Sequence, residues 1–178
     1  MRIIAGRAKG RGLVVPESGT RPMTGRARES IFSILSPHVQ DARVLDLFAG
    51  SGSLGLEALS RGAAEATFIE RNRVAVGAIE SNIAAVGLGG SVVRGSVPEA
   101  LVGLRGRYDI VFVDPPYGDS DASVESTLVS LDQVLSADGL VVVHRQASSG
   151  AFGVDFLTSI DERRYGDAVV TMMKRATP

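Results

Sequence analysis

The sequence predicts a single α/β domain in which a mostly parallel sheet carries helices on both faces. Short apolar runs typical of buried strands alternate with longer segments of helical periodicity, which is the pattern of such folds. Two of the apolar runs, 43–48 and 108–113, end abruptly, one at a glycine-rich turn and the other at Pro115-Pro116. Because ligands bind at the carboxyl edge of open α/β sheets, these two strand ends locate the candidate site.

Composition limits the classes of protein that fit. The 178 residues suit one domain with a substantial core. The chain has no cysteine, and its two histidines, His38 and His144, are far apart, so we expect neither disulfides nor a metal site. No apolar run is long enough to span a membrane and no apolar leader follows Arg2, so we expect a cytoplasmic protein, with a monomer as the default.

The N-terminal part of the chain is basic, whereas the rest is acidic. Residues 1–28 carry seven basic residues against one acidic residue, in a chain whose net charge is −1. A basic arm on an acidic body is typical of contact with a nucleic-acid backbone, and a solvated terminus is the alternative. The candidate contacts are Arg2, Arg7, Lys9, Arg11, Arg21 and Arg26.

Residues 1–38 are expected to form an extension that consists of a small hairpin and a helix. Two short β-like runs, 2–5 and 12–15, are separated by a turn that contains glycines. Thr24 is the expected N-cap of the helix, and Pro37 is expected to end it.

The main domain, residues 39–178, opens on its first buried strand and a glycine-rich turn. Gly50, Gly52 and Gly55 match the pattern Gly-x-Gly-x-x-Gly, which lies between a strand and a helix in nucleotide-cofactor sites. Twenty residues after Gly50, Glu70 ends the next strand. A carboxylate at that position accepts hydrogen bonds from the hydroxyls of a ribose.

Asp46 helps to separate the two ligands that fit this turn. An acid two residues before the strand end would repel the pyrophosphate of a dinucleotide. The same acid suits the cationic amino group of the methionine portion of S-adenosylmethionine, directly or through water. An NAD(P)-binding oxidoreductase stays the remoter alternative, because no later residue offers an obvious hydride-transfer site.

The second strand end delivers a carboxylate, two rigid residues and an aromatic ring together, as Asp114-Pro115-Pro116-Tyr117. An aryl amine is a poor nucleophile because its lone pair is delocalised into the ring. Two acceptors for its N–H groups, the Asp114 carboxylate and the Pro115 carbonyl, would aim that lone pair. Tyr117 offers a face for a base taken out of its stack. A strand-ending turn without function is the alternative.

The remaining segments complete the alternation of strands and helices. Asn72 is expected to cap a helix that ends at Gly87, with Asn82 on its surface. Ser96 follows the next strand, and His144 is expected to be structural. The other expected elements are helices over 56–60, from Pro98 to Leu104 and across 128–135, a turn at Asp138-Gly139, and strands over 91–94, 140–143, 156–160 and 168–173.

Three motifs resemble those of a known enzyme family. The range 114–117 resembles the Asp/Asn/Ser-Pro-Pro-Tyr/Phe motif of methyltransferases that act on exocyclic amines of bases. The range 46–52, Asp-x-Phe-x-Gly-x-Gly, resembles the first motif of class I methyltransferases. The range 21–32 resembles the Arg-Pro-Thr-x-x-x-x-Arg/Lys-Glu-x-x-Phe segment of bacterial enzymes that methylate a guanine N2 amine of small-subunit (16S) ribosomal RNA. Met23 stands where threonine is frequent in that segment.

The resemblance implies a seven-stranded class I methyltransferase (Rossmann-like) sheet closed by two C-terminal strands. It also implies S-adenosylmethionine as cofactor and a guanine of 16S ribosomal RNA, within the assembled small subunit, as substrate. The implied catalytic residues are Asp114, Pro115, Pro116 and Tyr117. The implied cofactor contacts are Asp46, Phe48, Gly50, Gly52, Glu70, Arg71 and Ser96, with Thr24, Arg28 and Phe32 near the methionine end. A DNA amino-methyltransferase and a module that only senses the cofactor remain alternatives.

Overall fold

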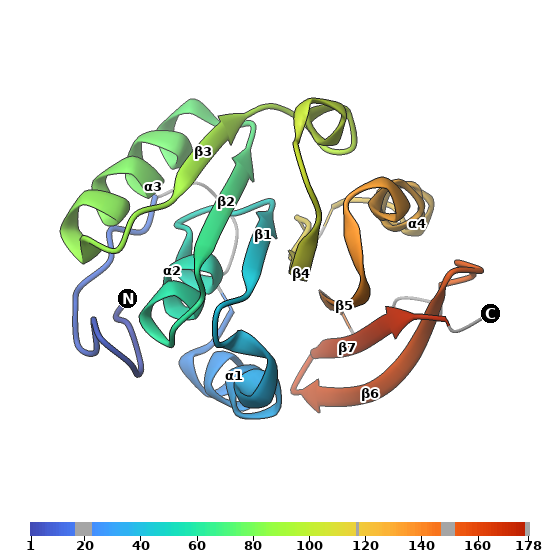
Figure 1. The fold of residues 1–178 in the computed structure, drawn as a ribbon, viewed down its shortest axis with the longest axis horizontal. Coiled ribbons are helices and arrows are strands. Elements are labelled where there is room, and N and C mark those ends of the chain that lie inside the picture. Colours follow the sequence, from blue (N-terminus) through green and yellow to red (C-terminus); the bar gives the residue numbers. More distant parts are fainter. Residues whose placement is uncertain (17–22, 117, 147–151, 177–178) are drawn as a thin grey trace.

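The computed structural model describes residues 1–16, 23–116, 118–146 and 152–176, which contain one seven-stranded sheet (Figure 1). Its strands are β1 (Arg43–Leu47), β2 (Glu65–Glu70), β3 (Ser91–Arg94), β4 (Tyr108–Val113), β5 (Leu135–Gln146), β6 (Leu157–Tyr165) and β7 (Ala168–Arg175). Their order is β3-β2-β1-β4-β5-β7-β6. β1 to β5 pair in parallel, and β7 lies antiparallel between β5 and β6. The predicted sheet with its closing strand pair is confirmed.

Helices cover both faces of the sheet, as predicted. They are α1 (Gly25–Val39), α2 (Ser53–Ser60), α3 (Arg73–Val86) and α4 (Asp121–Ser130), with the short 3-10 helices η1 (Glu99–Gly103) and η2 (Leu131–Gln133). α1, α2 and α3 pack on one face, in a cluster that contains Phe32, Phe68 and Phe112, and α4 and the 3-10 helices pack on the other (Figure 1). Among the residues described, no helix is long and apolar enough to cross a membrane.

Several predicted element boundaries are wrong. The helix predicted across 128–135 is not continuous, because α4 ends at Ser130, η2 follows and Leu135 begins β5. Pro37 lies inside α1, which continues to Val39. The burial of Val39 stabilises the last turn although Pro37 has no N–H to donate. α2 begins at Ser53, three residues earlier than predicted, because the glycine turn leads directly into it. The predicted turn at Asp138-Gly139 lies within β5, where an irregularity in the register with β4 accommodates the extra residues.

The N-terminal segment, residues 1–16, folds back onto the rest of the chain. The predicted hairpin is reduced to one antiparallel bridge between Arg2 and Gly12, flanked by a few backbone hydrogen bonds. Ile3, Ala8 and Leu13 are buried in the same apolar cluster as α1, α2 and α3. The boundary between an extension and a catalytic domain stays a prediction, and the two parts share one core.

A buried carboxylate anchors this N-terminal segment to α2. Glu57 is fully buried, and its two oxygens accept hydrogen bonds from the backbone N–H groups of Ile4 at 2.7 Å and Ala5 at 3.0 Å. Arg61 forms an ion pair with the same carboxylate at 2.7 Å. Because all three donors converge on one side chain, Glu57 fixes where the segment crosses α2.

Replacing Glu57 with glutamine should lower the free energy of unfolding by about 3 kcal/mol, because the Arg61 charge loses its buried partner. The amide also directs a donor at one of the backbone N–H groups. Urea unfolding measures the change, and amide hydrogen exchange at Ile4 and Ala5 should become faster. Glu80→Gln, an exposed position on α3, is the control, with an expected change below about 0.5 kcal/mol. Equal midpoints for the two variants would contradict the anchor.

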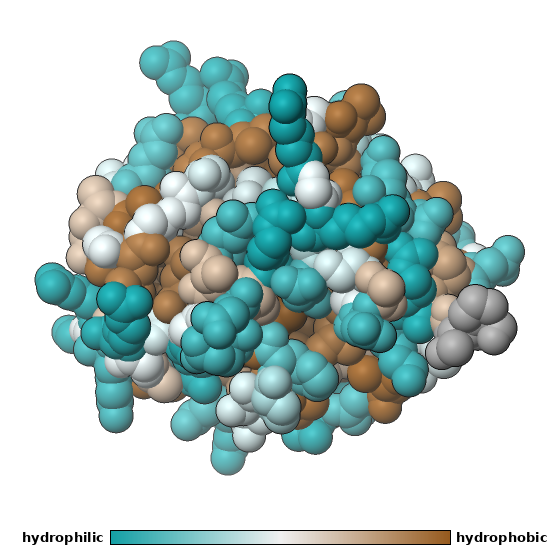
Figure 2. Space-filling view, viewed as in Figure 1, coloured by the Kyte–Doolittle hydropathy of each residue, from teal (hydrophilic) through white to brown (hydrophobic). Residues whose placement is uncertain are grey.

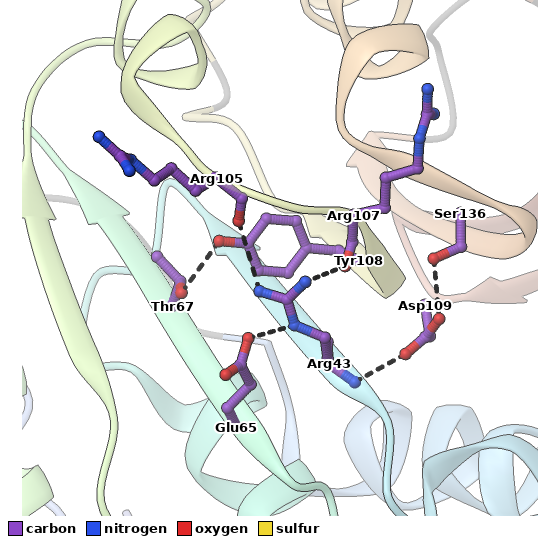
Figure 3. Close-up of polar contacts among 8 residues, drawn as sticks. All are labelled: Arg43, Glu65, Thr67, Arg105, Arg107, Tyr108, Asp109 and Ser136. Carbon is purple, nitrogen blue, oxygen red and sulfur yellow. Dashed lines mark hydrogen bonds and ion pairs between the residues drawn. The ribbon is translucent and has the colours of Figure 1, made fainter.

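A polar network joins the amino ends of three neighbouring strands, β2, β1 and β4 (Figure 3). Arg43 opens β1, its backbone N–H donates to Asp109 at 2.9 Å, and its side chain forms an ion pair with Glu65 at 2.5 Å. The Tyr108 hydroxyl donates to Thr67 at 3.2 Å. These contacts link the amino ends of β1, β2 and β4, and they support the register that aligns the carboxyl ends of the same strands.

Candidate active site

The carboxyl ends of four neighbouring strands bring the predicted site residues into one row. Glu70 ends β2, and Phe48 and Asp114 directly follow the paired last residues of β1 and β4. His144 of β5 directly follows the residue that pairs with the last residue of β4. The glycine turn and the Asp114 motif, which are far apart in the sequence, therefore lie along the same edge, as predicted.

A cavity of about 410 Å³ lies along this row. Its volume is in the range of small-molecule sites. The predicted residues in its wall are Phe48, Gly50, Glu70, Arg71, Ser96, Asp114, Pro115 and Pro116. Val15, Pro16 and Met23 form a further part of the wall. The N-terminal part of the chain therefore shapes the site, which the sequence did not predict for these three residues.

Left-handed backbone conformations shape the glycine turn. Gly50 has a φ of 58° and Gly52 a φ of 73°, values that residues with a side chain rarely adopt. A Cβ on Gly55 would lie 2.4 Å from the Phe68 ring, so only glycine fits at this approach of α2 to β2. The backbone conformation at Gly50 and Gly52, and the lack of room for a Cβ at Gly55, thus explain the glycine pattern of the sequence.

Glu70 holds the glycine turn in place. Its Oε2 accepts a hydrogen bond from the Gly50 N–H at 3.0 Å, and its Oε1 accepts one from the Asn72 N–H at 2.8 Å. Asn72 caps α3 through the backbone N–H groups of Val74 and Ala75, as predicted. Since each carboxylate oxygen accepts about two hydrogen bonds, Glu70 keeps acceptor capacity for ligand hydroxyls.

Asp46 lies beneath the turn and is not part of the cavity wall. It is 1% exposed, and its Oδ2 accepts a hydrogen bond from the Gly55 N–H at 2.9 Å, at the start of α2. Burial raises the pKa of Asp46 well above its usual range, and the charges of Asp114 and Glu70 add to that rise, although the Gly55 hydrogen bond opposes it. This placement does not support a direct contact with a cofactor, because the side chain is almost fully buried and is not part of the cavity wall.

Replacing Asp46 with asparagine should flatten the dependence of stability on pH. The raised pKa means that the folded protein holds a proton where the unfolded chain has lost it, so wild-type stability falls as pH rises above about 4. Asparagine still accepts from the Gly55 N–H but carries no charge. Urea unfolding across pH measures both slopes. Asp138→Asn, at an exposed carboxylate, should keep the wild-type slope, and an equally steep slope for Asp46→Asn would refute the assignment.

The Asp114 carboxylate lies in the cavity wall and contacts a histidine. Its side chain is 30% exposed, and its Oδ1 lies 2.7 Å from Nδ1 of His144, whose side chain is 5% exposed. Pro115 and Pro116 line the cavity beside it, and Tyr117 lies outside the described residues. The sequence predicted only a structural role for His144. The parallel pairing of β4 with β5, which no local sequence pattern specifies, places the two side chains next to each other.

Asn82 is buried, contrary to its predicted surface position. Its Oδ1 accepts a hydrogen bond from the Val14 N–H at 2.8 Å, and its Nδ2 donates to the carbonyls of Val14 and Ser51, both at 2.9 Å. The side chain therefore ties the N-terminal segment to the glycine turn. The sequence did contain a signal for this burial. Asn82 lies three residues after Ile79 and four before Val86, so it shares the buried face of α3 with them.

Five residues predicted to lie at or near the cofactor are not part of the cavity wall: Asp46, Gly52, Thr24, Arg28 and Phe32, whose ring is fully buried in the core. Thr24 is the N-cap of α1, as predicted, and its side chain accepts from the Ala27 N–H at 3.2 Å. Arg28 is 2% exposed and donates to the Arg2 carbonyl at 2.7 Å and to the Met1 sulfur at 2.9 Å. Burial lowers the pKa of its guanidinium. Arg28 therefore holds the N-terminal segment, because that segment folds across α1.

The basic side chains predicted to contact nucleic acid lie on the surface. Those that the structure describes are Arg2, Arg7, Lys9, Arg11 and Arg26, all exposed, and Arg21 lies outside the described residues. Figure 2 shows hydrophilic side chains projecting from the left edge of the molecule, where Figure 1 draws the N-terminal segment in dark blue. Ile3, Ala8 and Leu13 of that segment point into the core, whereas its charged side chains face the solvent.

Comparison with known proteins decides the family. A family model described as "Conserved hypothetical protein 95" matches residues 1–174. The chain belongs to this family. It is 41% identical over 152 residues to Ribosomal RNA small subunit methyltransferase D of Escherichia coli (strain K12), covering 84% of this chain and 77% of that protein. The protein of the same name from Haemophilus influenzae is 32% identical over 172 residues, covering 93% and 89%.

Solved structures agree with this family membership. The structure of yhhF from Escherichia coli superposes with a TM-score of 0.89 at 37% identity, covering 98% of this chain and 97% of that one. A methyltransferase structure from Streptococcus mutans, at 17% identity and a TM-score of 0.73, shares the fold. The chain is therefore a methyltransferase with the Rossmann-like class I fold.

Proposed function

We propose that this methyltransferase transfers a methyl group from S-adenosylmethionine to the exocyclic N2 amine of a guanine in 16S ribosomal RNA, within the assembled small subunit. The observation that carries the proposal is the position of Asp114, Pro115 and Pro116 in the wall of the same cavity as Glu70 and the glycine turn. Relatives named as small-subunit ribosomal RNA methyltransferases support the substrate class. Ribosomal RNA is made in the cytoplasm of bacteria, where we expect the protein to act.

The cavity wall fits S-adenosylmethionine in its chemistry. Glu70 would accept hydrogen bonds from the ribose hydroxyls with the acceptor capacity that the turn leaves unused. Ser96 would accept from the adenine amine, and Arg71 would lie at the rim. Phe48 and Gly50 would bring backbone groups to the methionine portion. Gly52 shapes the turn, and the buried Asp46 would act indirectly, by holding the start of α2 beneath the turn. When bound, the cofactor would supply an electrophilic methyl group on a sulfonium, with a neutral thioether as the leaving group.

The chain's own residues would orient the amine rather than act as a strong base. The Asp114 carboxylate and the Pro115 carbonyl would each accept one N–H of the guanine amine, which directs the nitrogen lone pair along the line of transfer. The methylated nitrogen would then lose a proton to water. Pro116 restricts the backbone that carries the Pro115 carbonyl. Tyr117 would stack on the base removed from its helix.

The exposed basic arm would contact RNA phosphates, and neutralising it should weaken that binding. Replacing Arg7, Lys9 and Arg11 together with glutamine should reduce the slope of log K against log salt by about 2, because each phosphate that is no longer neutralised removes about 0.7–0.9 from the slope. Filter binding of small-subunit RNA at several salt concentrations measures the slope. The matched control replaces the exposed residues Arg105, Arg164 and Lys174. An equal reduction of the slope in both triple variants would mean that the arm is not the surface that binds RNA.

The substrate class can be tested by methyl transfer from labelled S-adenosylmethionine. Small ribosomal subunits purified from cells that lack this enzyme, naked 16S RNA and duplex DNA are each incubated with the wild-type protein. We expect label in the assembled subunits, with less in naked RNA and none in DNA. Label in DNA alone would overturn the RNA assignment and favour the DNA amino-methyltransferase, while cofactor binding without transfer to any substrate would favour a sensing module.

A further inference from the structure

We propose that His144 is a positioning residue that fixes the Asp114 carboxylate for the amine substrate. This inference rests on the proposed function, because it assigns a partner to the acceptor that orients the amine. The two side chains lie side by side at the ends of β4 and β5, with Asp114 Oδ1 and His144 Nδ1 2.7 Å apart. Within the described part of the chain, no other side chain forms a hydrogen bond or ion pair with the Asp114 carboxylate that would fix its rotation.

The direction of this hydrogen bond follows from the chemistry of the two groups. An ionised carboxylate only accepts hydrogen bonds, so the shared proton belongs to His144 Nδ1, which donates to Asp114 Oδ1. That contact uses one oxygen of Asp114 and leaves Oδ2 for an N–H of the substrate. A lone carboxylate on a sp³–sp² torsion rotates through a broad range, whereas a carboxylate held at one oxygen presents the other in a fixed direction.

The surroundings of His144 keep the donor in place. The side chain is 5% exposed, whereas that of Asp114 is 30% exposed. His144 lies in the middle of three paired strands, and its register partner on β7 is the buried Val170. A packed ring on a central strand has little room to move, so the more exposed carboxylate adjusts to the histidine. The contact therefore orders the part of the site that meets the substrate.

The inference predicts a loss of turnover that depends on the donor at Nδ1. Leucine and asparagine have the same branched shape, but only asparagine places an N–H group near the position of Nδ1. His144→Leu should lower kcat by about 10–100-fold, as expected for an acceptor that loses its alignment. His144→Asn should recover kcat to within about 5-fold of the wild type. Calorimetric affinity for S-adenosylmethionine should stay within about 3-fold in both variants, because Glu70 and the glycine turn are unchanged.

The kinetic assay uses the full-length protein and labelled small subunits. Recovery by asparagine but not by leucine would support the inference. Equal activity of His144→Leu and the wild type would overturn it, and so would equal losses in the two variants, since the donor would then make no difference. Failure of the proposed function is a separate result, because it appears in the wild type itself as absence of label in guanine.

A second measurement keeps the inference testable if the leucine variant does not fold. The chain has two histidines, so ¹⁵N spectra of the imidazole nitrogens are readily assigned by means of His144→Asn. In the wild type, Nδ1 of His144 should carry the proton and should shift when Asp114 is replaced with asparagine, while His38 should not change. A wild-type spectrum in which Nδ1 carries no proton would overturn the hydrogen bond and the inference with it.

Discussion

Replacing Asp114 with alanine should lower turnover by about 1,000-fold or more, a loss comparable with removal of a preorganised polar group from other active sites. The affinity for S-adenosylmethionine should remain within about 3-fold of the wild type, because Glu70 and the glycine turn hold the cofactor in this account. Turnover and cofactor affinity should respond differently because Asp114 would contact the amine, whereas the cofactor would contact the other side of the cavity. Single-turnover methyl transfer and calorimetry measure the two quantities separately.

Two further variants make the Asp114 result interpretable. Asp114→Asn keeps one acceptor oxygen in the same place, so it should retain more activity than the alanine variant. Asp138→Ala removes an exposed carboxylate that is not part of the cavity wall, and it should turn over like the wild type. Near-normal turnover in Asp114→Ala would remove this residue from the mechanism.

Replacing Glu70 with alanine should raise the dissociation constant for S-adenosylmethionine by about 100-fold, which corresponds to about 2.7 kcal/mol. Two effects act together in this variant. The proposed ribose contacts disappear, and the backbone N–H groups of Gly50 and Asn72 lose the carboxylate that accepts from them. At saturating cofactor, turnover should fall by less than about 10-fold, because the groups that orient the amine remain.

Glu65 provides the matched control for the Glu70 variant. It lies at the other end of the same strand, β2, where its carboxylate forms an ion pair with Arg43 (Figure 3). Glu65→Ala should leave cofactor affinity unchanged. If Glu70→Ala bound the cofactor as tightly as Glu65→Ala does, the ribose would have to be held by another residue.

The sequence predicted the parts of the site whose structure depends on residues that are close together in the chain. A glycine pattern between a strand and a helix reports backbone conformations at Gly50 and Gly52 and the close approach at Gly55. Pro115 and Pro116 end a strand because proline cannot donate to the sheet. The carboxylates of Glu70 and Asp114 were found because the ends of parallel strands lie at one edge.

The parts that the sequence did not predict depend on partners that are far away in the chain. Glu57 and Asn82 are buried polar residues that bind backbone groups of the N-terminal segment, 52 to 68 residues away. The contact of His144 with Asp114 requires the pairing of β4 with β5, which no local pattern specifies. Arg28 was assigned by resemblance to the cofactor site, yet its contacts are with the first two residues of the chain.

The identity of the methylated nucleoside distinguishes methylation of a guanine N2 amine from methylation of any other base. Small subunits lacking the modification are labelled by the wild-type protein and by Asp114→Ala in parallel, the RNA is digested, and the nucleosides are separated and identified by mass. We expect label in N2-methylguanosine with the wild type and almost none with the variant. Label in a methylated adenosine or cytidine would contradict the assigned base, and label of similar amount with both proteins would contradict the role of Asp114.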